Sequence, residues 1–183
     1  QREAADGFSR VVMLDTQFRM HPRLGDFVSK QFYENAGLGK VHSGRKAEEF
    51  VAEVPGFGAV VCAWRDVPAH AGSEESHGTS RRRRPEAKRV ASEIQRLLTV
   101  LQQDMSLGVI TFYAAQRDCI FEELAGFGIS EKVDGAWRVR PEHAANAQCA
   151  ERLRIGTVDA FQGKEFDVVL LSVVRSNALS LGL

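Results

Sequence analysis

The sequence has 183 residues, with 24 Lys and Arg against 24 Asp and Glu, so its formal net charge is zero. Its content of 44% hydrophobic and 26% charged residues is typical of an ordinary globular domain and excludes a disordered chain. No apolar run approaches the roughly 20 residues that span a bilayer, so a membrane protein is not expected. Because the net charge is zero, any binding of nucleic acid requires a local basic patch or a partner domain.

The cysteines and histidines give no sign of a disulfide framework or a metal site. Cys62, Cys119 and Cys149 are odd in number and lie far apart, which favours reduced thiols and a cytosolic or nuclear protein. The five histidines show no metal-binding spacing, and the sequence contains no CxxC or HExxH pair. We therefore expect no metal site made by this chain.

The first part of the chain predicts two strands and one helix. Residues 11–14 are a short apolar run typical of a strand, and Pro22 then occupies a favourable first position of a helix. Residues 58–64 form a second strand candidate after a glycine-rich stretch. Residues 65–84 are rich in Gly, Ser, His and charge, so we expect a mobile surface loop there.

Helices and strands alternate in the rest of the sequence. Pro85 opens a pattern whose apolar residues recur every three or four positions, which predicts an amphipathic helix that covers a sheet. A strand is expected at residues 108–112, followed by a second helix, and further strands around residues 153–155 and at 168–174. Residues 130–151 are polar and without periodicity, so we expect an insertion there. The five expected strands predict an α/β domain with a mostly parallel central sheet and helices on both faces.

The turn between the last two expected strands holds residues suited to an anionic ligand. In open α/β sheets, ligands bind outside the carboxyl ends of the strands. The polar residues of this turn are Thr157, Asp159, Gln162, Gly163, Lys164 and Glu165.

Three segments of the sequence resemble motifs of one family. Residues 157–177, TVDAFQGKEFDVVLLSVVRSN, are similar to motif V of superfamily 1 helicases, in the 5′-to-3′ group around the nonsense-mediated-decay helicase. Residues 14–22, LDTQFRMHP, resemble motif IV, and residues 108–120, GVITFYAAQRDCI, resemble the strand and helix between the two motifs. The resemblance implies that residues 1–183 form the second of two RecA-like motor domains, a three-layer domain of the P-loop NTPase type.

The resemblance also implies which parts of the motor lie outside this sequence. There is no G-x-x-x-x-G-K-[ST] loop, although Lys40 and Lys164 each follow a glycine. ATP and its Mg²⁺ are therefore expected to be held by a first RecA-like domain of the same parent protein. The motif VI region does not follow motif V before Leu183, so we expect a fragment without ATPase activity of its own.

Three residues of the motif IV segment are candidates for nucleotide contacts. By position alone, Arg19 is equally compatible with an arginine finger and with an ion pair to Asp15 or Asp26; the resemblance implies the catalytic finger, whose planar donors suit a transferring γ-phosphoryl group. Phe18 stands where the family commonly has tyrosine, and its ring is expected either to stack on adenine or to pack in the core. Gln17 is expected to contact the nucleotide or to brace Arg19.

In the motif V turn, Gly163 and Glu165 are the candidates for nucleotide binding. Gly163 allows the backbone to approach a ligand closely, and the carboxylate of Glu165 can accept hydrogen bonds from ribose hydroxyls. The alternative for Glu165 is a surface ion pair with Lys164.

Five further residues are candidates for contacts with single-stranded DNA or RNA. Thr157 and Thr111 lie at predicted strand ends, where similar helicases hold the phosphate backbone. Gln116 is expected to orient loops on this side or to cap its helix. Arg81 and Arg82 belong to a dense basic run, which either contacts phosphates or is simply solvated.

Two functions are compatible with these observations. The first is the motor half of an ATP-dependent helicase or translocase, favoured because Arg19, Gly163 and Glu165 are intact. The second is a helicase-like module that binds nucleic acid or protein without turnover.

Overall fold

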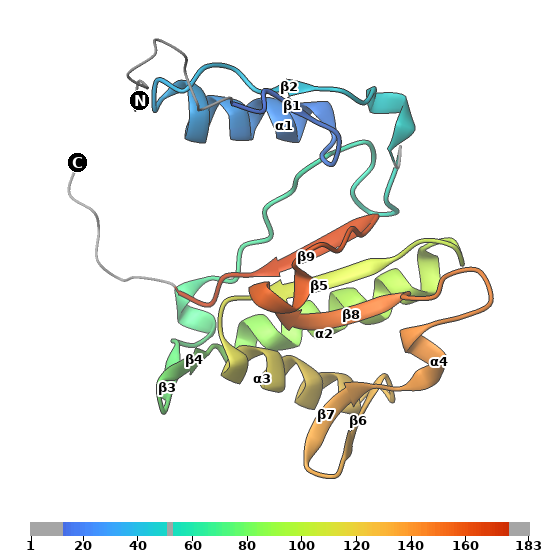
Figure 1. Ribbon diagram of the computed structural model, residues 1–183. Helices are drawn as coiled ribbons and strands as arrows, with labels where there is room; N and C mark the ends of the chain where they lie inside the picture. Colours follow the sequence, from blue (N-terminus) through green and yellow to red (C-terminus); the bar gives the residue numbers. More distant parts are fainter. Residues whose placement is uncertain (1–12, 51–52, 176–183) are drawn as a thin grey trace. The chain divides into compact units, whose positions relative to one another are not determined.

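The computed structural model describes residues 13–50 and 53–175, and the chain divides into two compact units, residues 1–63 and 64–183 (Figure 1). The first unit is built on two short parallel strands and a helix that begins with Pro22 at its first position, as predicted. The strand expected at residues 11–14 lies partly outside the described residues, and residues 13 and 14 are not in a strand. The elements of this unit are β1 (Thr16–Gln17), α1 (Pro22–Val28), the π-helix η1 (Ser29–Glu34), β2 (His42–Ser43) and the 3₁₀ turn η2 (Ala47–Glu49).

The strand predicted at residues 58–64 was wrong. Gly56 and Gly58 both have positive φ, and Gly58 closes a turn through an isolated bridge to Val54. The apolar side chains that follow face solvent, with Trp64 81% exposed. The run is apolar, but within the described residues it has no neighbouring strand to pair with.

The second unit contains a three-stranded parallel sheet in the order β8-β5-β9. β5 (Leu107–Thr111) is the central strand, and β8 (Leu153–Thr157) and β9 (Val168–Ser172) flank it. Thr111 pairs with Thr157 on one side and with Ser172 on the other, so all three strands end in register. The predicted strands after residue 100 and the α/β class with a parallel sheet are thus confirmed.

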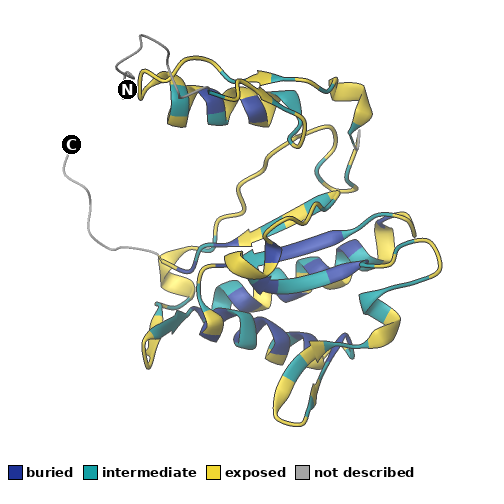
Figure 2. Ribbon diagram, in the orientation of Figure 1, coloured by how far each residue is buried: buried dark blue, intermediate teal, exposed yellow. Residues whose placement is uncertain are grey.

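Two helices cover one face of this sheet, and the core lies beneath them (Figure 2). α2 (Arg84–Val100) and α3 (Ala114–Ala125) pack against each other, and the predicted apolar stripe of α2 points inward. Burial of apolar surface stabilises the fold by about 25 cal/mol for each Å² that is removed from water. The most deeply buried apolar residues of α2, α3 and β5 are Ala87, Ala91, Ile94, Leu97, Leu107, Val109, Cys119, Ile120 and Leu124.

The other face of the sheet is covered in part by the chain that joins β8 to β9. This connection contains the 3₁₀ turn η4 (Val158–Phe161), whose Phe161 ring lies 5.3 Å from that of Phe166. A Cβ on Gly108 would come within 3.0 Å of both rings, so glycine allows them to lie directly on β5. At the outer strand β9, Leu171 is 55% exposed on this face.

Both segments expected to be irregular contain regular structure. Within residues 65–84, an antiparallel hairpin follows a 3₁₀ turn, so the mobile loop expected there is instead partly ordered by strand pairing. Residues 130–151, where we expected an irregular insertion, contain a second hairpin that turns at Asp134 and Gly135, both at positive φ. The elements are η3 (Ala69–Ala71), β3 (Glu75–His77), β4 (Ser80–Arg82), β6 (Ser130–Val133), β7 (Ala136–Val139) and α4 (Pro141–Ala144).

Candidate functional site

The motif IV turn is shaped by the side chain of Gln17. Its Oε1 accepts hydrogen bonds from the backbone N–H groups of Arg19 at 2.9 Å and Met20 at 2.7 Å. Its Nε2 donates to the Met20 carbonyl at 2.9 Å and to Ser43 Oγ at 2.8 Å. These four bonds use the whole hydrogen-bonding capacity of the amide. Of the two roles expected for Gln17, bracing the backbone at Arg19 is the one that this geometry fits.

A glycine in α1 makes room for this arrangement. A Cβ on Gly25 would lie 2.8 Å from both Gln17 Nε2 and Ser43 Oγ, so any larger residue would push the amide out of place. His21 caps the start of this helix, because its Nδ1 accepts a hydrogen bond from the Arg23 N–H at 3.2 Å.

Phe18 and Arg19 are presented on the surface of this turn. Phe18 is 64% exposed, so core packing within this unit, which was one of its two expected roles, is excluded. Arg19 is also exposed, directly after the aromatic ring. The turn therefore offers a flat apolar surface and a guanidinium side by side in sequence.

The motif V turn is anchored at both ends while its middle faces solvent. Asp167 Oδ2 accepts hydrogen bonds from the N–H and the Oγ of Ser106, at 2.8 and 2.7 Å. At the other end, the Lys164 N–H donates to the Phe161 carbonyl at 3.0 Å. Gly163 lies between these anchors at φ +76°. Both Gly163 and Glu165 are exposed.

Lys164 is held by an acidic residue that precedes β8. Glu151 accepts a hydrogen bond from Lys164 Nζ at 2.9 Å and also pairs with Arg154. The hydrogen bond from Lys164, with the further bond and charge of Arg154, lowers the pKa of the Glu151 carboxyl below its ordinary value. This contact fixes Lys164 beside β8.

The residues expected to grip nucleic acid differ in exposure. Thr157 at the end of β8 is half-buried, while Thr111 at the end of β5 is fully buried and accepts a hydrogen bond from the Tyr113 N–H at 3.4 Å. Gln116 is also fully buried. The structure therefore brings Thr111 and Thr157 together at the carboxyl edge of the sheet, but the side chains of Thr111 and Gln116 do not reach the surface. The phosphate contact expected of Thr111 does not fit a side chain that is fully buried, and Gln116, expected to orient loops or to cap its helix, is buried as well.

Gln116 instead belongs to a buried polar network. Its Oε1 accepts from the Arg83 N–H at 2.8 Å, and its Nε2 donates to Ser172 Oγ at 3.0 Å. Ser172 Oγ donates in turn to Glu86 Oε1 at 2.7 Å. The sequence contained a signal for this network. Arg83 and Glu86 lie four positions before the apolar residues Ala87 and Val90 of the α2 stripe, and residues four positions apart share one face of a helix.

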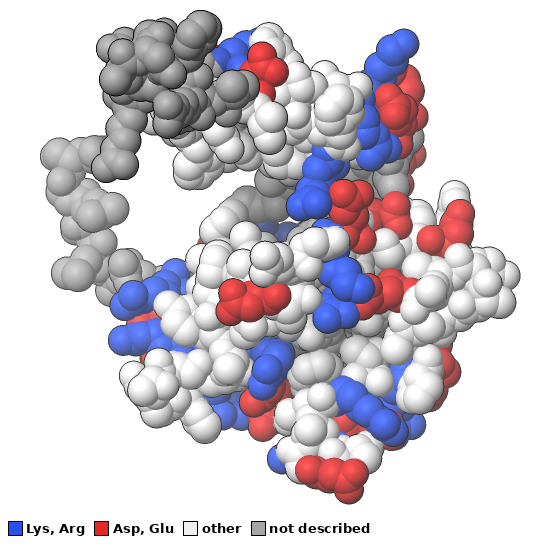
Figure 3. Space-filling model, in the orientation of Figure 1, with Lys and Arg blue, Asp and Glu red and all other residues white. Residues whose placement is uncertain are grey.

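The basic run is divided among different environments. Arg81 pairs with Glu74 at 2.7 Å and Arg82 with Glu75 at 3.0 Å across the β3–β4 hairpin. Arg83 is buried, and its guanidinium donates to backbone carbonyls of residues 67, 68 and 72. Basic and acidic side chains are likewise interspersed on the face shown in Figure 3. The run is thus mostly neutralised by neighbours and does not form a field of one sign.

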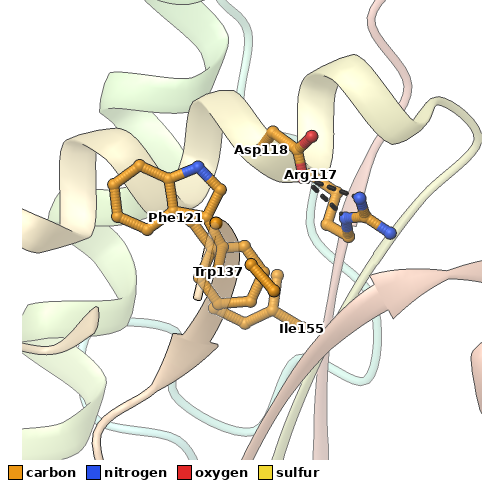
Figure 4. A pocket seen from close by; sticks show the side chains of 7 residues that line it. Arg117, Asp118, Phe121, Trp137 and Ile155 are labelled. Atoms are coloured by element: carbon orange, nitrogen blue, oxygen red, sulfur yellow. Dashed lines mark hydrogen bonds and ion pairs between the residues drawn. The ribbon is translucent and has the colours of Figure 1, made fainter. Parts of the chain in front are cut away.

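Two cavities lie away from these candidates. One of about 310 Å³ is lined by residues of α3, the β6–β7 hairpin and β8, among them the stacked rings of Phe121 and Trp137 and the Arg117–Asp118 pair (Figure 4). The other, of about 350 Å³, is in the first unit and includes His21 and Arg23 in its lining. Neither is lined by any residue predicted for the site.

Neither a metal-ligand cluster nor a membrane-spanning helix is present in the part of the chain that the structure describes. No group of three His, Cys, Asp or Glu residues gathers there as metal ligands would. Within the same residues, no helix has the length and apolar character needed to cross a membrane.

Comparisons with known proteins agree with the motifs. A family model described as an AAA domain matches residues 1–182. The chain is 32% identical over 171 residues to a Regulator of nonsense transcripts 1 homolog from Neurospora crassa, covering 91% of this chain and 14% of that protein. It is 30% identical over 173 residues to the ATP-dependent helicase NAM7 of Saccharomyces cerevisiae, covering 91% of this chain and 15% of that protein. The chain thus spans only a small part of the length of these relatives, and it belongs to this AAA domain family as a superfamily 1 helicase domain of the nonsense-mediated-decay type.

Proposed function

We propose that this chain is the second RecA-like motor domain of an ATP-dependent helicase or translocase that moves on single-stranded DNA or RNA. Its partner is the first RecA-like domain of the same parent protein, which holds ATP and Mg²⁺. Two relatives carry the name ATP-dependent helicase, which supports ATP as the fuel. The free cysteines Cys62, Cys119 and Cys149 support a reducing compartment, the cytosol or nucleus.

The observation that carries the proposal is the turn that Gln17 holds. The amide oxygen of Gln17 accepts hydrogen bonds from the N–H groups of Arg19 and Met20, which fixes the backbone from which the Arg19 side chain extends. A guanidinium on a fixed backbone loses little freedom when it meets the oxygens of a γ-phosphoryl group. Arg19 is accordingly the arginine finger, and Phe18 stacks on the adenine.

The motif V turn supplies the remaining nucleotide contacts in this proposal. The chain is anchored at Asp167 and Phe161, and the exposed backbone of Gly163 at φ +76° lies between these points. A position without a Cβ lets a ligand approach the main chain. Glu165 then accepts hydrogen bonds from the ribose hydroxyls.

On the nucleic-acid side, we assign the phosphate contact to Thr157, whose side chain is half-buried at the edge of the sheet. Thr111 and Gln116 act from beneath, by fixing the ends of β5 and β9. Arg81 and Arg82 exchange their glutamate partners for phosphates. This exchange costs least at Arg82, because its pair with Glu75 is exposed and exposed ion pairs are worth only about 0 to 1 kcal/mol, whereas the pair of Arg81 with Glu74 is partly buried.

Substitution of Arg19 in the parent protein tests the finger. Arg19→Ala is expected to lower kcat for ATP on the order of a thousandfold or more, while the affinity for single-stranded nucleic acid is retained. Arg19→Lys keeps the charge but loses the planar fork, so it is expected to rescue little. The matched control is Arg23→Ala, an exposed arginine on α1, which should leave turnover near the wild-type rate. Near-wild-type turnover of the Arg19 variants would remove the finger role.

The alternative, a binding module without turnover, makes the opposite prediction for the parent protein. It would bind nucleic acid, but ATP hydrolysis would be absent and Arg19→Ala would change nothing. The isolated chain is expected to be inactive under either function, so only the parent protein distinguishes them.

A further inference from the structure

The ring of Phe18 lies over the backbone of Gly44. β1 and β2 are parallel, with Gln17 opposite Ser43, and the Gly44 N–H continues the ladder to the Gln17 carbonyl at 2.8 Å. Phe18 and Gly44 are therefore the next pair in the register. Because side chains alternate along a strand, this pair faces away from the side on which Gln17 bonds to Ser43.

Gly44 leaves the space that the ring occupies. A Cβ built on Gly44 would lie 2.1 Å from Phe18 Cε1 and 2.6 Å from both Cδ1 and Cζ, far inside van der Waals contact. Gly44 is not among the glycines with positive φ, so its backbone would accept alanine without strain. The three atoms nearest to this Cβ all belong to the Phe18 ring, so the ring is the first obstacle to a larger residue at this position. Cross-strand aromatic rings cover strand glycines in the same way in other sheets.

This contact fixes the ring while leaving much of it open. The inner side of the Phe18 ring rests on Gly44, and 64% of the residue remains exposed to solvent. The backbone that follows Phe18 is held by the hydrogen bonds that Arg19 N–H and Met20 N–H donate to Gln17 Oε1. A ring that is already placed binds a flat ligand without the loss of freedom that a mobile side chain would suffer.

We propose that Gly44 is a positioning residue for the nucleotide base, acting through Phe18. The inference rests on the proposed function, in which Phe18 stacks on the base of ATP. Phenylalanine carries no hydrogen-bonding group, so this contact recognises the flat π-face of a base and does not read its edge. Gly44 therefore contributes to nucleotide affinity and not to the chemical step.

The test compares Gly44→Ala, Phe18→Ala and the double variant in the parent protein, with KM and kcat for ATP measured under saturating single-stranded nucleic acid. Phe18→Ala is expected to raise KM about tenfold, the lower part of the range for losing a base stack. Gly44→Ala is expected to raise KM several-fold with kcat unchanged. The double variant should have the same KM as Phe18→Ala alone. Inhibition by inorganic tripolyphosphate, which has no base, should be the same in all variants.

The outcomes separate this inference from the proposed function. An increase in KM for Phe18→Ala but not for Gly44→Ala overturns the role of Gly44 and leaves the base stack in place. The role of Gly44 is also overturned if Gly44→Ala raises KM by the same factor in the wild-type protein and in the Phe18→Ala variant, because Gly44 would then act independently of the ring. An unchanged KM for Phe18→Ala removes the base stack itself. The atoms nearest to the added Cβ all belong to the ring of an exposed side chain, so folding is expected to be intact; Gly126→Ala, at the C-cap of α3 in the second unit, is the control for adding a methyl group.

Discussion

The side chain of Glu86 accepts a hydrogen bond from the backbone N–H of Val174, with 3.0 Å between Oε1 and N, across 88 residues of sequence. Val174 is buried and has φ +70°, and the Arg175 N–H donates back to the Val173 carbonyl at 2.8 Å. The chain therefore leaves β9 through a tight three-residue turn. A β-branched residue in this conformation is a genuine outlier, and the buried network holds it there.

Removing the charge of Glu86 is expected to weaken this turn. The carboxylate oxygen Oε1 receives bonds from both Ser172 Oγ and the Val174 N–H, and an amide in its place is a poorer acceptor that also brings two donors. Glu86→Gln should lower the free energy of unfolding by about 1 to 3 kcal/mol, measured by urea denaturation. Glu142→Gln, at an exposed glutamate, should change it by less than about 0.5 kcal/mol. Equal effects of the two would contradict the role of the network.

At Val174, substitution by glycine should give a more stable protein than substitution by alanine, the reverse of the usual order. At ordinary positions alanine is more stable than glycine by roughly 0.5 to 1 kcal/mol, but an L-residue at positive φ is strained by about 1 to 2 kcal/mol. Val174→Gly is therefore expected to be more stable than Val174→Ala, by about 1 kcal/mol. The same pair at Val109, buried within β5, should show the ordinary order. The ordinary order at both positions would mean that the turn is unstrained.

Replacing Arg152 with lysine is expected to destabilise the fold. This buried guanidinium donates to the carbonyls of Leu98, Gln102 and Gln103 at 3.2, 3.1 and 2.9 Å, where α2 ends. An ammonium group has no planar fork for three spread acceptors. Arg152→Lys should therefore lower the unfolding free energy by about 1.5 to 3 kcal/mol, whereas Arg138→Lys on the exposed hairpin should have little effect. Thermal or urea unfolding of both variants provides the comparison.

The three cysteines should react with a thiol reagent in a fixed order. Cys62 is exposed, Cys149 is half-buried and Cys119 is buried. Burial raises the pKa of the Cys119 thiol, and only the thiolate reacts. Cys119 should therefore be labelled only after unfolding, as mass spectrometry of alkylated peptides would reveal. Because its pKa is raised in the folded state, the thiol favours folding at neutral pH, and this contribution is lost as the pH rises through the folded-state pKa. Labelling of Cys119 at the rate of Cys62 in native protein would contradict its burial.

The salt dependence of nucleic-acid binding measures the proposed role of Arg81 and Arg82. If each replaces its glutamate with a phosphate, alanine at either position should reduce the slope of log K against log salt by about 1. Arg138→Ala, at an arginine paired on the other hairpin, serves as the control. Unchanged slopes would leave Arg81 and Arg82 with a role only in the hairpin.

Periodicity was sufficient to predict the second half of the fold. The α2 stripe and the central strand β5 have a sequence pattern that matches their burial, because they pack on the same core. The strands β8 and β9 form where expected, but the apolar run of β9 leaves Val169 and Leu171 about half exposed. The strand expected at residues 58–64 had a similar apolar pattern and failed, since a strand requires a neighbour with which to pair. The β6–β7 hairpin was missed although its Asp134-Gly135 turn is a strong hairpin signal, because the polar composition around it suggested irregular chain.

For the candidate site, the sequence alone determined the family, the α/β class and the identity of the motif IV and motif V residues, since these depend on local order along the chain. Only the tertiary structure decided what each side chain does. It turned Gln17 inward onto the Arg19 backbone, buried Gln116 and Thr111, and divided the arginine run between glutamates and carbonyls. The physical reason is that burial and hydrogen bonds depend on residues that are distant in sequence but close in space, such as Glu86 and Val174. The order of residues along the chain does not show which of them will meet.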